Sequence, residues 1–380
     1  VVIAGGGIIG TSIAYYLMKL QLQNELQKEN QSRDEIPKTI ATVTIIDPTG
    51  TVGSCASGKA GGFLAKDWRD HTPTQQLHRY GFELHQELAT EFASISSSST
   101  QLQTQSSRIP NKPPSKKLLH LDWDNDTGGG GVISMGDETT IAQVHPRKLC
   151  ETMWKQTELI AGGNGRNNEE DDDEPQKVKL LKGRIVQANT HNDNEKRVES
   201  VELEDGTIVP ADVLIIACGP WTYEANTCIK CHSILVHNTV VQSQAIFFDS
   251  NGAIGEDGDL EVYPRLDGDL YVNGFQNEEG VCIEKPNEEV IEQDKIELLR
   301  DAMDFVYKNN DQNICYWPET PDGIPIIGNI PNINGVYVAA GHSVWGILQG
   351  PSTGKAIAEL ILYGESYCID LTPFSLERYY

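Results

Sequence analysis

The chain has 380 residues, of which 38% are hydrophobic, and a formal net charge of −25 at pH 7. This length is enough to bury a sizeable core, and so negative a field repels a phosphate backbone, which argues against a nucleic-acid partner. No apolar run approaches the roughly 18 residues that a membrane helix needs. Eight cysteines are too few for a disulfide scaffold, so we expect a reducing, cytoplasmic environment. The chain opens at Val1 inside a predicted strand, which indicates a fragment whose targeting signal, if any, lies upstream.

Four stretches are polar and lack apolar periodicity, so we interpret them as insertions that form surface loops or are disordered. They are residues 21–37, 94–115, 162–176 and 191–196. Without them, the chain alternates strand-like and helix-like segments, as an α/β protein does.

Apolar periodicity predicts helices at residues 8–20, 80–92, 146–161, 288–307 and 352–362. Apolar and β-branched runs predict strands at residues 1–4, 39–47, 211–217, 240–248, 261–264, 270–275 and 335–340. Residues 177–188, 197–203 and 207–210 predict a small antiparallel meander.

Three glycines lie between the first predicted strand and the first predicted helix, in the pattern Gly5-x-Gly7-x-x-Gly10. The first glycine allows a tight turn, the second lets the backbone approach a pyrophosphate, and the third allows close packing of helix on strand. The helix N-terminus then offers N–H groups and a positive dipole end to the phosphates. The acid expected to hold the ribose is Asp47, whose spacing becomes normal once the insertion 21–37 is removed. The sequence therefore predicts a binding site for ADP.

The rest of the chain carries motifs that resemble, in the same order, those of the D-amino-acid oxidase family, which includes glycine oxidase and sarcosine oxidase. They are residues 53–64 (GSCASGKAGGFL), 144–149 (VHPRKL), 217–221 (ACGPW), 320–328 (TPDGIPIIG) and 341–355 (GHSVWGILQGPSTGK). Residues 54–64 and 320–328 most resemble a eukaryotic branch typified by the yeast oxidoreductase TDA-three. The resemblance covers nearly all of the chain outside the insertions and makes FAD the expected cofactor.

The resemblance implies an α/β fold. A doubly wound, Rossmann-like FAD-binding domain would be interleaved with an α+β substrate domain built on an antiparallel sheet. The FAD-binding domain would comprise residues 1–78, 144–228 and 315–380, and the substrate domain residues 79–143 and 229–314. The loop at residues 341–350, followed by a helix near Pro351, would aim backbone N–H groups at the flavin.

The residues that the resemblance implies for FAD binding come from both ends and the middle of the chain. They are Gly5, Gly6, Gly7, Ile8, Ile9, Gly10, Asp47, Ser54, Ser57, Ala60, Gly61, Gly62, Val186, Ala217, Gly219, Trp221, Cys315, Asp322, Gly341, Val344, Trp345, Gly346 and Ile347.

The implied activity is oxidation of the C–N bond of an amine or amino acid, by hydride transfer from the carbon next to nitrogen to the flavin. The partners would be that small molecule and O₂ or another electron acceptor, and no metal is expected. Two alternatives stay open. A nicotinamide-dependent dehydrogenase shares the first glycine motif but does not explain residues 341–355. An FAD-binding protein of the same fold with an interaction or trafficking role would turn over little amine.

The substrate side departs from the family pattern. Trp317 and Val344 stand where glycine oxidase-like members carry arginines, one of which binds the substrate carboxylate. Arg265 is an alternative anion partner, or else a residue of a surface salt bridge. With Tyr263 and Trp317, Trp345 is expected to wall a pocket for an apolar or cationic amine. The candidate catalytic residues are Trp317, Arg265, His342 and Tyr263.

Two cysteine motifs each have a functional and a plain interpretation. Cys315 precedes the Thr-Pro-Asp segment at the spacing that, in sarcosine oxidase-like members, carries a covalent bond to the flavin; otherwise it is a small buried residue. Cys228-x-x-Cys231-His232 has the pattern of a haem-attachment or redox motif, but it lies where a connecting segment is expected, and we favour coincidence.

Overall fold

The computed structural model describes residues 1–28, 38–95, 135–162, 176–191, 196–222, 227–237, 245–247, 260–265, 267–280, 288–302 and 310–380. Most of the insertions predicted at 21–37, 94–115, 162–176 and 191–196 lie outside these ranges.

A six-stranded sheet forms the centre of the larger part of the molecule. Its strand order is β15-β16-β9-β1-β2-β5, and all neighbours are parallel except β15 and β16. The strands are β15 (Ile326–Asn329), β16 (Val336–Ala340), β9 (Leu214–Ile216), β1 (Val2–Ala4), β2 (Val43–Asp47) and β5 (Val178–Lys182). Successive side chains point to opposite faces of these buried strands, so both faces need a covering layer.

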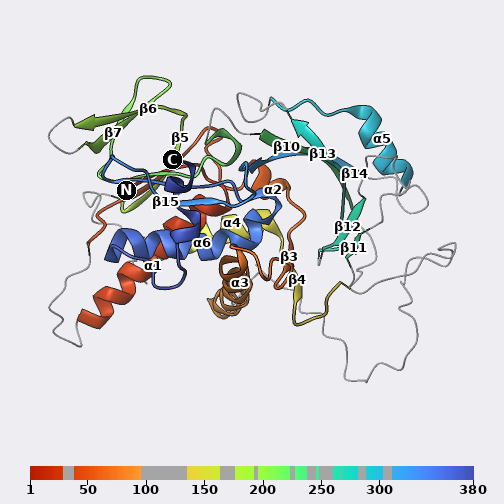
Figure 1. Cartoon of the computed structure of the whole chain (residues 1–380), viewed down its shortest axis with the longest axis horizontal. Helices are drawn as coiled ribbons and strands as arrows, with labels where there is room; N and C mark the ends of the chain where they lie inside the picture. The colour runs from red at the N-terminus through yellow and green to blue at the C-terminus, as the bar shows by residue number, and fades with distance from the viewer. Residues whose placement is uncertain are drawn as a thin grey trace.

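Helices cover one face of this sheet and a second sheet covers the other (Figure 1). The helices are α1 (Ile8–Lys28), α3 (Gln75–Ile95), α4 (Pro146–Gly162) and α6 (Gly346–Tyr363). Ile3, Ile45 and Ile215 pack in their hydrophobic core. The second sheet comprises β6 (Ile185–His191), β7 (Arg197–Leu203) and β8 (Ile208–Pro210). Val2 and Ile46, from the alternate positions of the central strands, pack in the core on that side.

A five-stranded antiparallel sheet with strand order β11-β12-β13-β10-β14 lies beside this body (Figure 1). Its strands are β11 (Ile246–Phe247), β12 (Glu261–Pro264), β13 (Leu270–Gly280), β10 (Thr227–Val236) and β14 (Asn310–Glu319). Helix α5 (Gln293–Ala302) covers one face, where Val262, Val272 and Leu299 are fully buried. The short elements α2 (Ala56–Lys59), β3 (Phe63–Ala65) and β4 (Ile141–Gln143) lie between the helices and this antiparallel sheet in Figure 1.

The expected α/β class, with a separate antiparallel sheet, is confirmed. Several element assignments were wrong. Residues 21–28 continue helix α1 instead of opening an insertion, because they are mostly straight-chain Gln, Leu, Glu and Lys, which favour a helix. β5 joins the central sheet instead of the meander, and β10 and β14 were not predicted at all. The division into five domain segments stays a prediction.

The helices that the structure describes include none with both the length and the apolar character needed to cross a membrane.

Candidate functional site

The turn between β1 and α1 can be built only with glycine at two of the predicted positions. Gly5 has a φ of +107°, and a Cβ there would lie 2.4 Å from the carbonyl oxygen of Ala217 on the neighbouring strand. A Cβ at Gly10 would lie 2.0 Å from the carbonyl oxygen of Gly5. The turn is therefore tight and the helix packs directly on it, as the glycine motif predicted.

Asp47 ends β2 beside this turn and is buried. Its Oδ2 accepts a hydrogen bond from the Gly6 N–H at 2.9 Å, and its Oδ1 accepts from the N–H and hydroxyl of Thr49 at 2.9 and 2.6 Å. The Thr49 hydroxyl also lies 2.8 Å from Ser54 Oγ. The structure thus brings Asp47, Ser54 and the glycine turn together, as a site for the ADP ribose requires.

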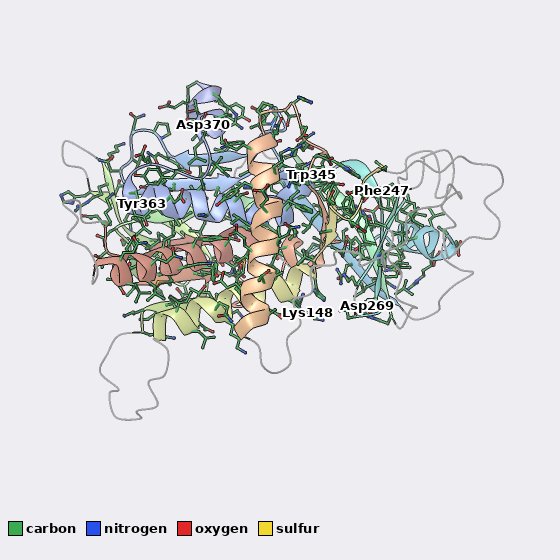
Figure 2. The ribbon with its side chains drawn as sticks, turned by 90° about the horizontal axis from the view of Figure 1, so that it is seen from below. Lys148, Phe247, Asp269, Trp345, Tyr363 and Asp370 are labelled. Atoms are coloured by element: carbon green, nitrogen blue, oxygen red, sulfur yellow. The ribbon has the colours of Figure 1, made fainter. Side chains whose placement is uncertain are left out.

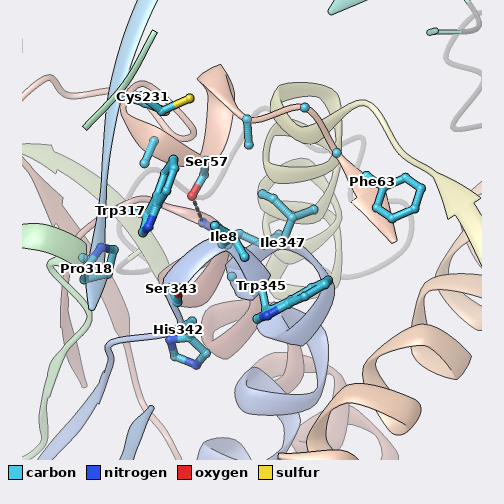
Figure 3. Close-up of a pocket in the computed structure, with 18 of the residues that line it drawn as sticks. Ile8, Ser57, Phe63, Cys231, Trp317, Pro318, His342, Ser343, Trp345 and Ile347 are labelled. Atoms are coloured by element: carbon cyan, nitrogen blue, oxygen red, sulfur yellow. Dashed lines mark hydrogen bonds between the residues drawn. The ribbon is translucent and has the colours of Figure 1, made fainter. Parts of the chain in front are cut away.

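The N-terminus of α1 faces a second predicted loop. The Ile8 N–H donates to Ser57 Oγ at 3.0 Å (Figure 3), and a Cβ at Gly7 would lie 3.0 Å from the same oxygen. A hydroxyl oxygen therefore already accepts from the helix N-terminus, where a phosphate oxygen is also a suitable acceptor. An N–H donor at this position fits a phosphate oxygen of the FAD pyrophosphate.

A cavity of about 260 Å³ connects the start of helix α1 with the start of helix α6 (Figure 3). Among the predicted flavin residues it is lined by Ile8, Ile9, Ser57, Ala60, Gly61, Gly62, Gly219, Cys315, Val344, Trp345, Gly346 and Ile347. Of the candidate catalytic residues, Trp317, His342 and Tyr263 also line it. Segments more than 300 residues apart in the sequence thus meet in one place.

Trp317 projects from β14 into this cavity (Figure 3). Its indole Nε1 is buried and has no hydrogen-bond partner among the described residues. A buried N–H without a partner is costly, so the indole is suited to donate to a polar atom of a bound cofactor or substrate. This is a second respect in which the cavity fits a flavin.

His342 is buried and directly precedes the 3-10 turn (Ser343–Trp345) that leads into helix α6 (Figure 3). Its Nε2 is 3.0 Å from the Thr353 hydroxyl, and burial lowers its pKa to about 3. The imidazole is therefore neutral at physiological pH and fixed to the helix. It can position the loop or exchange a hydrogen bond, but it offers no positive charge.

Helix α6 begins at Gly346, so the prediction of a loop to residue 350 and a helix from Pro351 was wrong. Pro351 lies inside the helix and has no N–H to donate to the carbonyl of Ile347, four residues earlier. His85 of α3 takes over this role, because its Nε2 lies 2.9 Å from that carbonyl oxygen. Tertiary packing therefore lets the helix start one turn earlier, and its N-terminal residues Gly346 and Ile347 line the cavity.

Aromatic rings line the side of the cavity next to the antiparallel sheet. Phe63 stacks on Tyr263 with centroids 5.3 Å apart, and Tyr263 stacks on Tyr271 at 5.9 Å. Trp68 lies 5.3 Å from Phe247 and 6.2 Å from Trp345, which joins this wall to helix α6. Figure 2 shows Phe247 and Trp345 on the two sides of this junction.

Polar residues that the sequence analysis missed stand on the same wall. Glu261 Oε2 accepts hydrogen bonds from the Tyr263 hydroxyl and, at 3.1 Å, from the Asn273 amide. Burial and the Glu261 charge raise the pKa of Tyr263, so the phenol stays a proton donor. The signal in the sequence was the period-two alternation of Glu261-Val-Tyr263 and Tyr271-Val-Asn273, which places valines on one face and polar or aromatic groups on the other.

Arg265 is not where the sequence analysis expected it. It is 5% exposed, so the surface salt bridge was wrong. It does not line the cavity. Its Nη2 donates to the Ala60 carbonyl at 2.9 Å, and its guanidinium lies 5.4 Å from the centre of the Tyr271 ring. The guanidinium thus packs on the Tyr271 ring, at the end of the stack that Phe63, Tyr263 and Tyr271 form.

The cysteine motifs lie in strands. Cys231 and Cys315 are opposite each other on β10 and β14, and both are buried and line the cavity. The hydrogen bond with Cys231 lowers the pKa of Cys315, and Cys231 has its pKa raised by the same contact. Cys228 is disulfide-bonded, whereas the cysteine count had predicted a reducing environment. The segment expected to be a connection is therefore strand β10.

Other predicted cofactor residues lie away from the cavity. Val186 is 55% exposed on β6, and the Asp322 carboxylate accepts from Arg378 and Tyr379 at 2.8 and 2.7 Å. Ala217 and Gly341 shape the neighbouring backbone, and Trp221 ends a short 3-10 helix after β9. Their contacts with FAD stay predictions.

The chain matches the sequence profile of the FAD dependent oxidoreductase (DAO) family over residues 1–105 and 138–360. It is 29% identical to "Putative oxidoreductase C1F5.03c" of Schizosaccharomyces pombe, over 96% of this chain and 94% of that protein. It is 24% identical to "Putative oxidoreductase TDA3" of Saccharomyces cerevisiae, over 68% of this chain and 55% of that protein. Among solved structures, glycine oxidase from Geobacillus kaustophilus superposes with a TM-score of 0.67 at 17% identity, over 99% of this chain and 97% of that one. The structural likeness shows a shared fold.

Proposed function

The chain belongs to the FAD dependent oxidoreductase (DAO) family, and from this premise we propose that it oxidises the C–N bond of an amine. FAD is the cofactor, and when bound it supplies the acceptor for the hydride that leaves the carbon next to nitrogen. The observation that carries the proposal is the shared cavity. Residues of the glycine turn and of helix α6 line one side of it, and the antiparallel sheet lines the other.

The chain's own residues have three tasks in this proposal. The N–H groups of the β1–α1 turn hold the pyrophosphate, and Asp47 holds the ribose. The N-terminal turn of α6, beginning at Gly346, presents a positive dipole end that favours negative charge on the reduced flavin. The aromatic wall from Phe63 to Trp345 keeps water out of the cavity, which favours an unprotonated amine.

No side-chain acid or base is required if the amine binds in its neutral form. His342 is neutral and Trp317 offers only an N–H, so both can orient a substrate without taking its proton. The product imine then hydrolyses in solution, and O₂ or another acceptor takes the electrons.

The cavity does not favour an α-amino acid. Among its described lining residues there is no Lys or Arg, and Val344 and Trp317 occupy the positions where related enzymes were expected to carry arginine. A buried carboxylate without a cation costs several kcal/mol. We therefore propose a substrate without an α-carboxylate.

The test is anaerobic mixing of the holoprotein with glycine, sarcosine, D-alanine, D-proline and a series of N-alkyl amines, while the absorbance of the oxidised flavin is followed. Bleaching by amines but not by glycine or D-alanine is the expected result. Rapid bleaching by micromolar glycine or D-alanine would refute the carboxylate-free substrate. Bleaching by none of the compounds would favour a flavin-binding protein with an interaction role.

A further inference from the structure

The Cys228-x-x-Cys231 motif is divided between the two faces of a strand. Both cysteines lie in β10, and residues three positions apart in a strand point to opposite faces. Cys228 packs with Ile314 and Tyr316 in a small hydrophobic cluster, whereas Cys231 lines the cavity. Cys228 is disulfide-bonded and Cys231 is a free thiol. The motif therefore leaves one free thiol, that of Cys231, at the cavity wall.

A second free thiol faces Cys231 across the strand pair. Cys315 is its direct partner in the register of β10 with β14, and both side chains are buried and line the cavity. Figure 3 shows Cys231 on the same side of the cavity as Trp317, which follows Cys315 on β14. Directly opposed residues of antiparallel strands have Cα atoms about 4.5 or 5.5 Å apart, and disulfides span about 4.4–6.8 Å. The register thus places the two cysteines at a separation that a disulfide can bridge.

The two thiols already interact, and they differ in acidity. They share a hydrogen bond, which holds the pKa of Cys315 below its ordinary value and, together with burial, raises the pKa of Cys231. The other polar contacts of Cys231 Sγ are all 3.6 Å or longer, and a thiol is a weak donor and acceptor. Cys315 is therefore the better nucleophile, and the contacts of Cys231 oppose a closer approach to it only weakly.

The cavity gives a small oxidant access to this pair. Its volume of about 260 Å³ is ample for hydrogen peroxide, a molecule only slightly larger than water. The other free cysteines in the described ranges do not line the cavity; they are Cys55, Cys150, Cys218 and Cys368. Among these free thiols, a peroxide in the cavity therefore meets those of Cys231 and Cys315.

We propose that Cys231 and Cys315 form a reversible oxidation site, at which a peroxide converts the two thiols into a cross-strand disulfide. The Cys315 sulfur attacks one peroxide oxygen, so the O–O bond breaks, a sulfenic acid forms, and the departing hydroxide leaves as water with the Cys315 thiol proton. The Cys231 sulfur then attacks the Cys315 sulfur, the S–O bond breaks, and a second water leaves with the Cys231 thiol proton. The two thiols lose two electrons and two protons, and the peroxide is reduced to two molecules of water.

The disulfide would protect the cavity wall from irreversible damage. A sulfenic acid without a neighbouring thiol is oxidised further to sulfinic and sulfonic acids, which thiols do not reduce. Such an acid would place a negative charge in a largely apolar wall, which is costly. The source of the oxidant rests on the proposed function, since O₂ that accepts two electrons and two protons becomes hydrogen peroxide. The site itself is tested with added peroxide.

The holoprotein is treated with hydrogen peroxide, its remaining thiols are blocked with N-ethylmaleimide, and tryptic peptides are mapped by mass spectrometry. Trypsin cleaves after Lys230, so Cys228 and Cys231 fall on separate peptides and the Cys228 disulfide is not mistaken for the new one. We expect a linked Cys231–Cys315 peptide that is absent before the peroxide is added and is lost again after dithiothreitol. Absence of the linked peptide after peroxide would overturn the proposal, as would accumulation of sulfinic acid on Cys315 in the wild type.

Two variants assign the roles of the cysteines. In Cys231→Ser the sulfenic acid on Cys315 has no thiol to react with, so we expect dimedone, which labels sulfenic acids, to modify Cys315 about tenfold more than in the wild type. In Cys315→Ser neither product should form, and Cys231 should stay reduced. The matched control is Cys368→Ser, which removes a free thiol outside the cavity and should give as much linked peptide as the wild type.

Equal dimedone labelling of Cys315 in Cys231→Ser and in the wild type would refute the role of Cys231. If a variant does not fold, the linked peptide in the wild type still decides the proposal.

An amine-dependent experiment separates this site from the proposed function. An amine that bleaches the flavin should produce the same linked peptide in air and none under nitrogen. If added peroxide links the cysteines but no amine bleaches the flavin, the proposed amine oxidation fails and the oxidation site stands. If an amine bleaches the flavin but added peroxide leaves both thiols free, the oxidation site fails and amine oxidation stands.

Discussion

Replacing His85 by leucine should destabilise the protein through one hydrogen bond to helix α6. His85 is 2% exposed, and burial lowers its pKa to about 4, so the ring is neutral. Its Nε2–H reaches the Ile347 carbonyl at 2.9 Å, which Pro351 leaves without its helical donor. His85→Leu leaves that buried carbonyl unsatisfied, at a cost of about 1–3 kcal/mol. Pro351→Ala restores an N–H that can donate to the same oxygen.

The double-mutant cycle in urea gives the measurement. His85→Leu should cost at least about 1 kcal/mol less in the Pro351→Ala background than in the wild type, because the alanine that replaces Pro351 would then supply the donor. His85→Gln, which keeps an N–H, is the matched control and should lose less than leucine. Equal losses in both backgrounds would refute the idea that His85 substitutes for the missing backbone donor. Flavin content should follow stability, because α6 begins at the cavity.

Three further predictions follow from the site. Gly10→Ala should weaken FAD binding by about 5- to 150-fold, equivalent to about 1–3 kcal/mol of overpacking. Gly162→Ala is the control and should leave FAD binding unchanged, because a Cβ there meets no atom within 4 Å. Titration of the apoprotein with FAD gives the measurement. Acid precipitation should release all the flavin, because the Cys315 thiol is hydrogen-bonded to Cys231 and we expect no covalent bond from it to the flavin. Yellow colour that stays with the precipitated protein, and that is lost in Cys315→Ala, would show such a bond instead. The pKa values of His85 and His342, lowered to about 4 and about 3, mean that the unfolded chain binds protons that the folded chain does not. Stability should therefore fall as the pH drops from about 6.5 toward about 4, by about 1.4 kcal/mol per pH unit for each histidine; equal urea midpoints at pH 7 and pH 5 would contradict this.

The cofactor half of the site could be predicted because its determinants are local. Gly5, Gly7 and Gly10 mark a turn whose geometry excludes a side chain at Gly5 and at Gly10, and the Asp47 carboxylate accepts a hydrogen bond from the backbone of that turn. The chain between Gly10 and Asp47 could vary in length without moving the glycine turn or Asp47, because strand β2 (Val43–Asp47) is anchored by pairing with β1. The error at residues 21–28 came from treating polarity as a sign of a loop, when the side chains there are good helix formers.

The substrate half could not be predicted because it depends on which strands pair. Cys231 and Cys315 are 84 positions apart in the sequence and face each other only through the register of β10 with β14. Neither strand shows a clean polar–apolar alternation, since Lys230, His232 and Ser233 interrupt β10. The early start of α6 was equally hidden, because the donor that permits it comes from another helix.

The loop at residues 60–62 connects the predicted cofactor part of the site with the proposed substrate part through direct contacts. A Cβ at Gly61 would lie 2.4 Å from Tyr263 Cδ2, so the loop backbone packs directly against the ring that donates to Glu261. The Ala60 carbonyl accepts from Arg265 at 2.9 Å, and the Gly61 carbonyl accepts from Gln143 at 2.5 Å. The loop predicted to face the flavin is thus held by the wall proposed to face the substrate. A ligand that shifts this wall should shift the loop at residues 60–62 as well, so the absorption spectrum of the bound flavin should report occupancy of the cavity.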